Sequence, residues 1–287
     1  MIRVDAPAKL NLYLHVVGRR ADGYHLIDSL AVFAALRDTL TATAADDLTL
    51  DVDGPFAAAL GGEADNLVLR AARALAEAHG TTARARLSLT KRIPVAAGLG
   101  GGSADAAATL QALSRLWKVA IPPDLGVRLG ADVPICFAGQ PSQMAGIGDR
   151  LTPAPALPAA SLLLVNPGIA MPTRDVFAKR QGPFSAAAPL AAAPHDAIEL
   201  AQSLRSRRND LTDAAMAIAP VIGDVIAAIE ATQGCLLARM SGSGATVFGL
   251  YAGDAEAEWA ARAIGAQHPR WFAWEGPMLQ PHPMSDG

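Results

Sequence analysis

The segment from Pro94 to Asp105, PVAAGLGGGSAD, is the feature that most constrains this chain. Its glycines stand directly before Ser103 and a helix-forming run, Ala104 to Trp117. Because glycine has no β-carbon, such a loop can turn tightly and point its backbone N–H groups inward. The following helix adds the unpaired N–H groups of its first turn and the positive end of its dipole. The sequence therefore predicts an anion cradle, which is typical of nucleotide phosphate sites.

The cradle does not match the two commonest phosphate-binding motifs. No G-x-x-x-x-G-K-[ST] occurs, and the spacing of Gly98, Gly100 and Ser103 reads G-x-G-x-x-S, which is not a dinucleotide fingerprint. A glycine-rich helix entry can also serve close packing alone. The density of glycines at the start of a helix favours phosphate binding over packing.

Composition excludes several classes of protein. A length of 287 residues suggests one large domain or two modest ones. The chain is 51% hydrophobic but only 5% aromatic, so we expect a core of small aliphatic side chains. A net charge of −3 gives no sign of a nucleic-acid or membrane surface. Cys136 and Cys235 belong to no metal-binding pattern, so we expect reduced thiols and no zinc site.

No targeting or spanning segment is expected either. The first residues, MIRVD, contain no apolar signal region, and no hydrophobic run reaches the length of a membrane span. We therefore expect a cytoplasmic protein. The sequence gives no reason to expect a protein partner.

Hydrophobic periodicity predicts the elements of the first half. Alternation predicts strands, and residues at helical spacing predict a helix that Asp65 caps and that ends at Ala78. A helix at 104–117 and a short one from Asp124 to Gly130 follow, and then a strand-rich stretch. A cluster of prolines at 153, 155 and 158 predicts a boundary between domains 1–152 and 153–287. The predicted strands are 9–16, 25–36, 39–43, 48–52 and 85–90.

The second half predicts further strands and helices with an alanine- and proline-rich loop at 186–194. Residues from Pro277 onward are expected to be a frayed tail. Helices interleaved with mostly antiparallel strands indicate the α+β class. The strands are expected at 162–165, 236–240, 246–251 and 271–274, and the helices from Pro172 and at 196–206, 210–231 and 254–266.

Lys9 and Asp132 are candidates for chemistry. Phosphoryl transfer needs a cation near the developing charge and a group that orients or deprotonates the acceptor. Lys9 follows Ala6-Pro7-Ala8 on a predicted strand, and Asp132 lies in the apolar sequence LGADVP. Asp132 can equally be a turn or cap residue, and Lys9 an ordinary lysine at a strand edge.

Two further segments have a functional and a structural interpretation. Ser241, Gly242, Ser243 and Gly244 join two predicted strands, and they can support the first glycine loop or simply form a hairpin. Tyr24 and His25 can stack on a planar ligand and hydrogen-bond to it, or they can be structural. Spacing alone does not decide either case.

Three sequence blocks together favour the functional interpretations, because they resemble the GHMP kinase superfamily in residues and in order. They are PAKLNL from Pro7, PVAAGLG from Pro94 and SGSG from Ser241. GRRADGYH from Gly18 and LGADVP from Leu129 are similar to the branch that phosphorylates 4-diphosphocytidyl-2-C-methyl-D-erythritol. The match extends from residue 6 to about 250.

The resemblance implies two α+β domains with the active site in the cleft between them. It also implies ATP-dependent phosphorylation of the 2-hydroxyl of that cytidine diphosphate substrate, in the non-mevalonate route to isoprenoid precursors. Asp132 would be the base, and Lys9 the cation that orients it. Tyr24, His25 and Phe177 would hold the cytosine, and Asn11 and Thr173 the polar part of the substrate. ATP would be bound by Asn66 and Lys91 near the adenine and by Pro94, Gly98, Leu99, Gly100, Gly101, Gly102 and Ser103.

One departure concerns the metal. Many superfamily members have two serines where this chain has Gly101 and Gly102, and one of those serines helps to hold magnesium. Mg²⁺ with ATP is expected, but no metal ligand is assigned. The alternatives are a kinase of another small alcohol, such as homoserine or mevalonate, and a nucleotide-binding regulator without activity. Tyr24 and His25 argue against the first, and retention of both Lys9 and Asp132 argues against the second.

Overall fold

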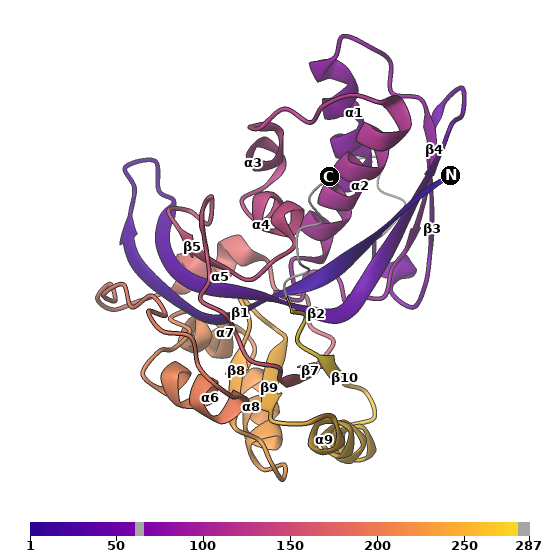
Figure 1. Cartoon of the computed structure of the whole chain (residues 1–287). Coiled ribbons are helices and arrows are strands. Elements are labelled where there is room, and N and C mark those ends of the chain that lie inside the picture. The colour runs from indigo at the N-terminus through magenta and orange to yellow at the C-terminus, as the bar shows by residue number, and fades with distance from the viewer. Residues whose placement is uncertain (61–65, 281–287) are drawn as a thin grey trace. The chain divides into compact units, whose positions relative to one another are not determined.

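The computed structural model describes residues 1–60 and 66–280, and its chain forms two compact units (Figure 1). Unit 1 comprises Met1–Lys9, Leu36–Val95 and Gly100–Gly139, and unit 2 comprises Leu10–Ala35, Ala96–Leu99 and the residues from Gln140 onward. The first two strands, β1 (Ile2–Arg19) and β2 (His25–Thr43), contribute to both units. The domain boundary at 152/153 falls inside unit 2 and stays a prediction.

Unit 1 is a sheet covered by helices on one face (Figure 1). Strands β3 (Leu48–Asp53) and β4 (Ala85–Thr90) pair in parallel, and β4 pairs antiparallel with the end of β2. Alternate residues of β4 are buried, namely Ala85, Leu87 and Leu89, as the period of two predicts. The helical elements of this unit are η1 (Ala57–Leu60), α1 (Leu67–Ala78), α2 (Gly101–Trp117), α3 (Leu125–Leu129) and α4 (Val133–Ala138).

Alanine dominates the packing of the two long helices of unit 1. Helix α2 buries Ala104, Ala106, Ala107, Ala108 and Ala112, and α1 packs against it through a face that includes Ala71 and Ala72. Small side chains let the helix axes approach closely. The expectation of a core built from small aliphatic side chains is confirmed.

Three predictions in the first half were wrong in detail. Strand β2 is continuous from His25 to Thr43, where two strands were expected. Asn66 caps α1, because its side chain accepts the N–H of Val68 at 2.9 Å; Asp65, the predicted cap, lies outside the described residues. Helix α4 lies in the stretch expected to be rich in strands, and its six residues, VPICFA, are apolar enough to suit either element.

Unit 2 contains the remaining strands and helices. The short strands β5 (Ser142–Ala145) and β6 (Arg150–Pro153) pair antiparallel, and β5 pairs with β2 at Ser29–Ala31. A second, antiparallel sheet contains β7 (Ser161–Asn166), which is buried throughout, with β8 (Leu237–Met240), β9 (Val247–Tyr251) and β10 (Phe272–Pro277), in the order β10-β7-β9-β8. The other elements are α5 (Thr173–Lys179), α6 (Ala197–Arg205), α7 (Thr212–Ile218), α8 (Val221–Glu230) and α9 (Asp254–Gln267).

Two predictions in the second half need correction. The helix expected at 210–231 is broken into α7 and α8, because Pro220 has no N–H to continue the ladder. The frayed tail expected from Pro277 is wrong for residues 277–280, and the rest of that segment lies outside the described residues. The N–H of Met278 donates to the carbonyl of Ala160, that of Leu279 donates to Phe33, and Met278 is buried.

The α+β class predicted from the sequence is confirmed. Helices and strands are interleaved along the chain. The pairs β2–β4, β2–β5, β5–β6, β7–β9, β7–β10 and β8–β9 are antiparallel, and β3–β4 is parallel. Within residues 1–60 and 66–280, no helix is both long and apolar enough to cross a bilayer.

Candidate active site

Lys9 and Asp132 form an ion pair in unit 1. The Nζ atom of Lys9 lies 2.9 Å from Oδ2 of Asp132. The lysine side chain is only 4% exposed, whereas the carboxylate is 35% exposed. Asp132 stands at the N-cap position of α4 but makes no side-chain cap hydrogen bond. Its carboxylate is therefore held by Lys9 and remains accessible to a ligand.

The last glycine before α2 lies against this pair. Gly100 has a φ of +62°, and a β-carbon there would lie 3.3 Å from Cβ and Cε of Lys9 and 3.9 Å from Oδ2 of Asp132. A side chain at this position would crowd the pair and strain the backbone. Helix α2 begins at Gly101, the residue after Gly100. The unpaired N–H groups of its first turn therefore begin next to the glycine that contacts the Lys9–Asp132 pair.

The earlier part of the glycine loop, residues 96–99, belongs to unit 2 and is fixed there by the second glycine cluster. The hydroxyl of Ser241 donates to the carbonyl of Gly98 at 2.9 Å, and the N–H of Thr246 donates to Ala97 at 3.1 Å. Gly98 has a φ of +73°, and a β-carbon there would lie 2.5 Å from the carbonyl oxygen of Ser241. Only glycine fits this approach, and the buried Leu99 anchors the loop beside it.

Asn11 continues this hydrogen-bonded network. Its backbone N–H donates to the hydroxyl of Ser241 at 3.1 Å, and its side-chain amide donates to Ser29 at 2.7 Å. Ser29 in turn donates to the carbonyl of Tyr13. The side chain of Asn11 is thus held in one orientation, and its carbonyl oxygen lies 3.3 Å from where a β-carbon of Gly242 would be.

Sequence reasoning missed the residue that anchors the second glycine cluster. The side-chain amide of Asn209 donates to the carbonyls of Met240 and Gly242, each at 2.8 Å. Asn209 precedes α7, where the N–H of Leu211 donates to its side-chain oxygen. The only signal in the sequence is a polar residue beside a helix start, which is too common to indicate this role.

The predicted base-binding residues form an aromatic group in unit 2. The rings of His25 and Phe177 stack with centroids 5.1 Å apart and planes 26° from parallel. Tyr24 is 61% exposed at the end of a turn. Burial lowers the pKa of His25, and the charges of Arg19 and Arg180 lower it further. His25 is therefore neutral at pH 7, so its ring can both donate and accept a hydrogen bond.

Thr173 and Phe177 are one turn apart on α5 and so share a face of the helix. The hydroxyl of Thr173 lies 3.0 Å from that of Ser243. This contact ties the second glycine cluster to the helix that carries Phe177. The predicted substrate residues all lie in unit 2, on β1, on β2, in the turn between these strands and on α5.

Two predicted adenine residues have quite different surroundings. Asn66 uses its side-chain oxygen to cap α1, which leaves its NH₂ group as a donor. The side chain of Lys91 is 2% exposed, and its ammonium is bound by two buried carboxylates, Asp38 and Asp105. Sequence reasoning missed these partners, which lie 53 and 14 residues away.

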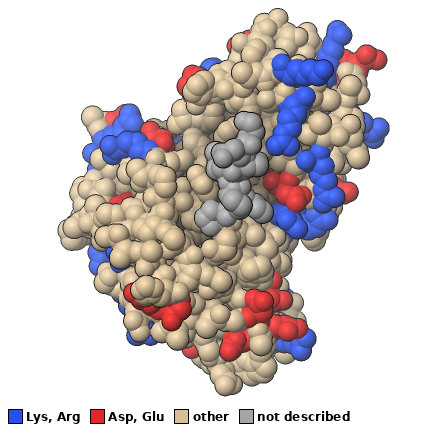
Figure 2. Space-filling model, in the orientation of Figure 1, with Lys and Arg blue, Asp and Glu red and all other residues tan. Residues whose placement is uncertain are grey.

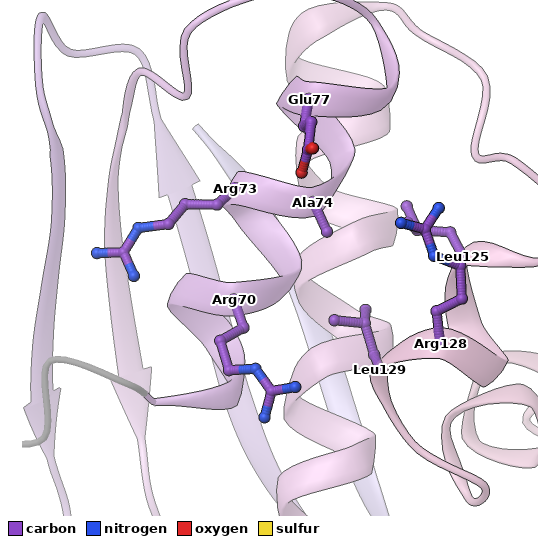
Figure 3. Close-up of a pocket in the computed structure, with 7 residues that line it drawn as sticks. All are labelled: Arg70, Arg73, Ala74, Glu77, Leu125, Arg128 and Leu129. Atoms are coloured by element: carbon purple, nitrogen blue, oxygen red, sulfur yellow. The ribbon is translucent and has the colours of Figure 1, made fainter.

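A separate hollow lies between α1 and α3 (Figure 3) and contains none of the predicted site residues. Its volume is about 360 Å³, and it is lined by Arg70, Arg73, Ala74, Glu77, Leu125, Arg128 and Leu129. In Figure 3 the Arg73 side chain extends away from Leu125 and Leu129. Arg128 lies 3.9 Å from Asp124, an exposed pair. The hollow is thus distinct from the Lys9–Asp132 pair.

The visible surface does not form one large field of either sign (Figure 2). Basic side chains gather in a row at the upper right, and acidic ones lie in several separate places. Exposed arginines of unit 1 include ones paired with carboxylates, such as Arg86 with Asp51 at 2.9 Å and Arg37 with Asp5 at 3.3 Å.

Known families match both halves of the chain. The model of the GHMP kinases N terminal domain matches residues 66–151, and that of the GHMP kinases C terminal domain matches residues 187–270. A protein of Paramagnetospirillum magneticum named 4-diphosphocytidyl-2-C-methyl-D-erythritol kinase is 58% identical over 94% of this chain and 95% of its own length. A protein of Rhodospirillum rubrum with the same name is 57% identical over 93% and 90%. The chain belongs to this kinase family, within the GHMP kinases.

Solved structures agree with this assignment. A crystal structure of 4-(cytidine 5'-diphospho)-2C-methyl-D-erythritol kinase matches with a TM-score of 0.80 and 35% identity, covering 98% of this chain and all of that one. Homoserine kinase from Cytophaga hutchinsonii matches with a TM-score of 0.72 at 18% identity, covering 97% of this chain and 94% of that one. The second similarity shows a shared fold only. The GHMP kinase resemblance seen in the sequence is confirmed.

Proposed function

We propose that this protein transfers the γ-phosphoryl group of ATP to the 2-hydroxyl of 4-diphosphocytidyl-2-C-methyl-D-erythritol, in the non-mevalonate route to isoprenoid precursors. The observation that carries the chemistry is the Lys9–Asp132 pair, a buried ammonium 2.9 Å from a carboxylate that is 35% exposed. The names and coverage of the relatives support the choice of substrate. ATP is supplied in the cytoplasm, and that location is part of the proposal.

Asp132 acts as the base and Lys9 as the cation in this mechanism. The carboxylate accepts the proton of the 2-hydroxyl while the hydroxyl oxygen forms a bond to the γ-phosphorus. The bond between that phosphorus and the bridging oxygen breaks, and ADP leaves with the bond's electrons. Lys9 orients Asp132, and its positive charge favours the negative charge that develops on the phosphoryl oxygens.

The glycine loop and the start of α2 bind the phosphates of ATP in this proposal. The N–H groups at Gly101, Gly102 and Ser103 are the unpaired donors of a 17-residue helix, whose dipole adds positive potential. Asn66 offers its NH₂ group to the adenine. Pro94, Gly98 and Leu99 shape the loop.

Magnesium would accompany ATP. Among residues 1–60 and 66–280 no group of three or more His, Cys, Asp or Glu side chains could hold a metal ion by itself. This suits Mg²⁺, which usually binds through substrate phosphates and one or two protein carboxylates and keeps several waters. The ion would supply charge neutralisation at the phosphates, and no protein ligand is assigned to it.

Unit 2 recognises the cytidine part of the substrate. Tyr24 supplies an exposed aromatic face for stacking. The next residue, His25, stacks on Phe177 of α5. The neutral ring of His25 can pair with the base, which presents both donors and acceptors. Asn11 and Thr173 contact the polar part of the substrate, and Ser241 to Gly244 support the loop.

The direct test is ADP release from the purified protein with Mg²⁺-ATP. The reaction is run with 4-diphosphocytidyl-2-C-methyl-D-erythritol, with homoserine, with mevalonate and with no acceptor. We expect release only with the cytidine substrate. ADP release with homoserine or mevalonate instead would show that the protein is a kinase of that alcohol. Binding of ATP without ADP release in any reaction would indicate a nucleotide-binding regulator.

The stacking role is tested by Tyr24→Ala. Base stacking on an aromatic ring contributes about 1–3 kcal/mol, so KM for the cytidine substrate should rise on the order of tenfold to hundredfold. KM for ATP should change little. Trp259→Ala is the matched control, because Trp259 is a similarly exposed aromatic (54%) on α9. An equal rise of both KM values in Tyr24→Ala would rule out the stacking role.

A further inference from the structure

Unit 1 contains a second lysine–carboxylate cluster, formed by Asp38, Lys91 and Asp105. The ammonium of Lys91 donates to Oδ2 of Asp38 and, at 2.7 Å, to Oδ2 of Asp105. The side chains of Lys91, Asp38 and Asp105 are 2%, 0% and 3% exposed. No substrate atom can reach such a cluster, so its role must act through its neighbours.

The two carboxylates are bonded unequally. Oδ1 of Asp38 accepts the backbone N–H groups of Arg92 at 2.5 Å and Ile93 at 2.8 Å, in addition to the bond from Lys91 to its other oxygen. Asp105 accepts only from Lys91, and its Oδ1 is buried without a hydrogen-bond partner. Asp38 is thus saturated with donors, whereas Asp105 lacks one.

The cluster lies against the start of α2. A β-carbon at Gly101 would lie 3.0 Å from Nζ of Lys91 and 3.1 Å from Cγ2 of Ile93. Asp105 stands one turn further along the same helix, Lys91 directly follows β4, and Asp38 is on β2. The ammonium therefore connects three elements at the turn where the glycine loop becomes a helix.

A proton would complete the cluster. Two ionised carboxylates and one ammonium leave a buried net charge of −1, which is costly in a medium of low polarity. The carboxyl groups of Asp105 and Asp38 bind the same ammonium, so they lie next to each other. A proton on Asp105 would remove the net charge and supply the missing donor.

We propose that Asp38, Lys91 and Asp105 position the first turn of α2, with Asp38 as the charged partner of Lys91 and Asp105 as the neutral member. The proposal rests on the proposed function in one respect, that this turn binds the phosphates of ATP. It gives Lys91 a positioning role in place of a contact with adenine.

The electrostatics of Asp105 agree with this assignment. Burial raises its pKa to about 7 against the pull of Lys91, and the charge of Asp38 adds to the rise. The thiol of Cys136 on α4 also faces this cluster, and burial keeps it protonated by raising its pKa. The charges of Asp132 and Lys9 act on the same thiol. Helix α1 faces α2 with apolar residues, which are Val68, Ala71, Ala72 and Leu75.

This gives a definite dependence of stability on pH. The folded pKa of about 7 lies above the ordinary value of 3.8, so the folded protein keeps a proton that the unfolded chain loses. The contribution of Asp105 is greatest at low pH and is lost as the pH rises from about 4 through about 7.

The same substitution at each carboxylate tests the proposal. In Asp105→Asn the amide oxygen can accept from Lys91 and the NH₂ can donate to Asp38, as the protonated acid would. Thermal unfolding of the whole protein is measured at pH 5 and pH 8. At pH 8, Asp105→Asn should unfold at the wild-type temperature or above, and its advantage over wild type should shrink at pH 5. Asp38→Asn should unfold at a lower temperature at both pH values.

Two results of this arm would overturn the proposal. One is that Asp105→Asn destabilises the protein at pH 8 as much as Asp38→Asn does. The other is that the difference between Asp105→Asn and wild type is the same at both pH values. Neither result depends on ATP, so this arm stands whether or not the proposed function holds.

Binding of ATP and of tripolyphosphate by Lys91→Met, measured by calorimetry, separates positioning from adenine contact. If Lys91 positions the phosphate cradle, both ligands should weaken by the same factor, on the order of tenfold. Weaker binding of ATP alone would return Lys91 to the adenine. If Lys91→Met does not fold, thermal unfolding of Asp105→Asn and Asp38→Asn decides the proposal alone. Wild-type protein that binds neither ATP nor tripolyphosphate would count against the proposed function instead.

Discussion

Unit 1 holds two lysine–carboxylate groups that have the same chemistry and opposite surroundings. In the Lys9–Asp132 pair the carboxylate is 35% exposed, and it makes no bond to the helix that it precedes. In the cluster around Lys91 both carboxylates are sealed, and Asp38 accepts two backbone N–H groups as well. The first group is open to a substrate, and the second is part of the framework.

The difference in solvent access separates catalysis from stability. A carboxylate that water can reach is solvated when its cation is lost, so loss of the cation from the Lys9–Asp132 pair should cost only about 1 kcal/mol. A buried charge that loses its partner stays unsolvated, and breaking such a pair costs about 3–5 kcal/mol. The open pair should therefore matter for turnover and the sealed cluster for stability.

The largest effect is expected at the open pair. Asp132→Asn removes the base but keeps the size of the side chain, and loss of a general base lowers kcat by about 10²- to 10⁴-fold. The free energy of unfolding should fall by less than the roughly 3–5 kcal/mol of a fully buried pair, because the asparagine amide oxygen can still accept from the buried Lys9 ammonium. The measurements are steady-state ADP release and unfolding in urea on the same preparation.

Asp124→Asn is the control for this variant. Asp124 is an exposed carboxylate next to α3 and is loosely paired with Arg128 at 3.9 Å. It should leave both kcat and stability near the wild-type values. Turnover of Asp132→Asn within a few-fold of wild type would remove Asp132 from the mechanism.

The next effect is on stability, and the same substitution can be made in both groups. Lys91→Met leaves two buried carboxylates without a cation and should lower the free energy of unfolding by about 3–5 kcal/mol. Lys9→Met leaves only the partly exposed Asp132 and should lower it by about 1 kcal/mol. Urea unfolding at pH 8 compares the two. Equal losses would mean that burial of the carboxylates does not distinguish the groups.

The open pair could be predicted from the sequence, and the sealed cluster could not. Lys9 and Asp132 lie in blocks whose glycine and proline neighbours are unusual enough to indicate a family. Asp38, Lys91 and Asp105 are far apart in the chain, and Asp105 lies within a run of alanines. Nothing local indicates that tertiary pairing brings the three together, because β2 and β4 must first align.

The same reason explains which elements were predicted well. The alternating pattern of β4 and the spacing of α1 are local, so they were predicted. The six apolar residues of α4 carry no period, and their helical form depends on packing against α2. The position of the segment at Met278 depends on two backbone hydrogen bonds. Met278 donates to Ala160 and Leu279 donates to Phe33, and both acceptors are distant in sequence.

The smallest effect separates two adjacent glycines of the helix start. Gly102 has open space where a β-carbon would be, so Gly102→Ala should raise the free energy of unfolding by about 0.5–1 kcal/mol through helix propensity. Gly101→Ala should give no such gain, because its methyl group would press on the Lys91 ammonium at 3.0 Å and on Ile93 at 3.1 Å. Urea unfolding of the two variants measures the difference. Equal stabilisation by both alanines would show that the sealed cluster does not bear on the first turn of α2, and the contrast with the open pair would then rest on burial alone.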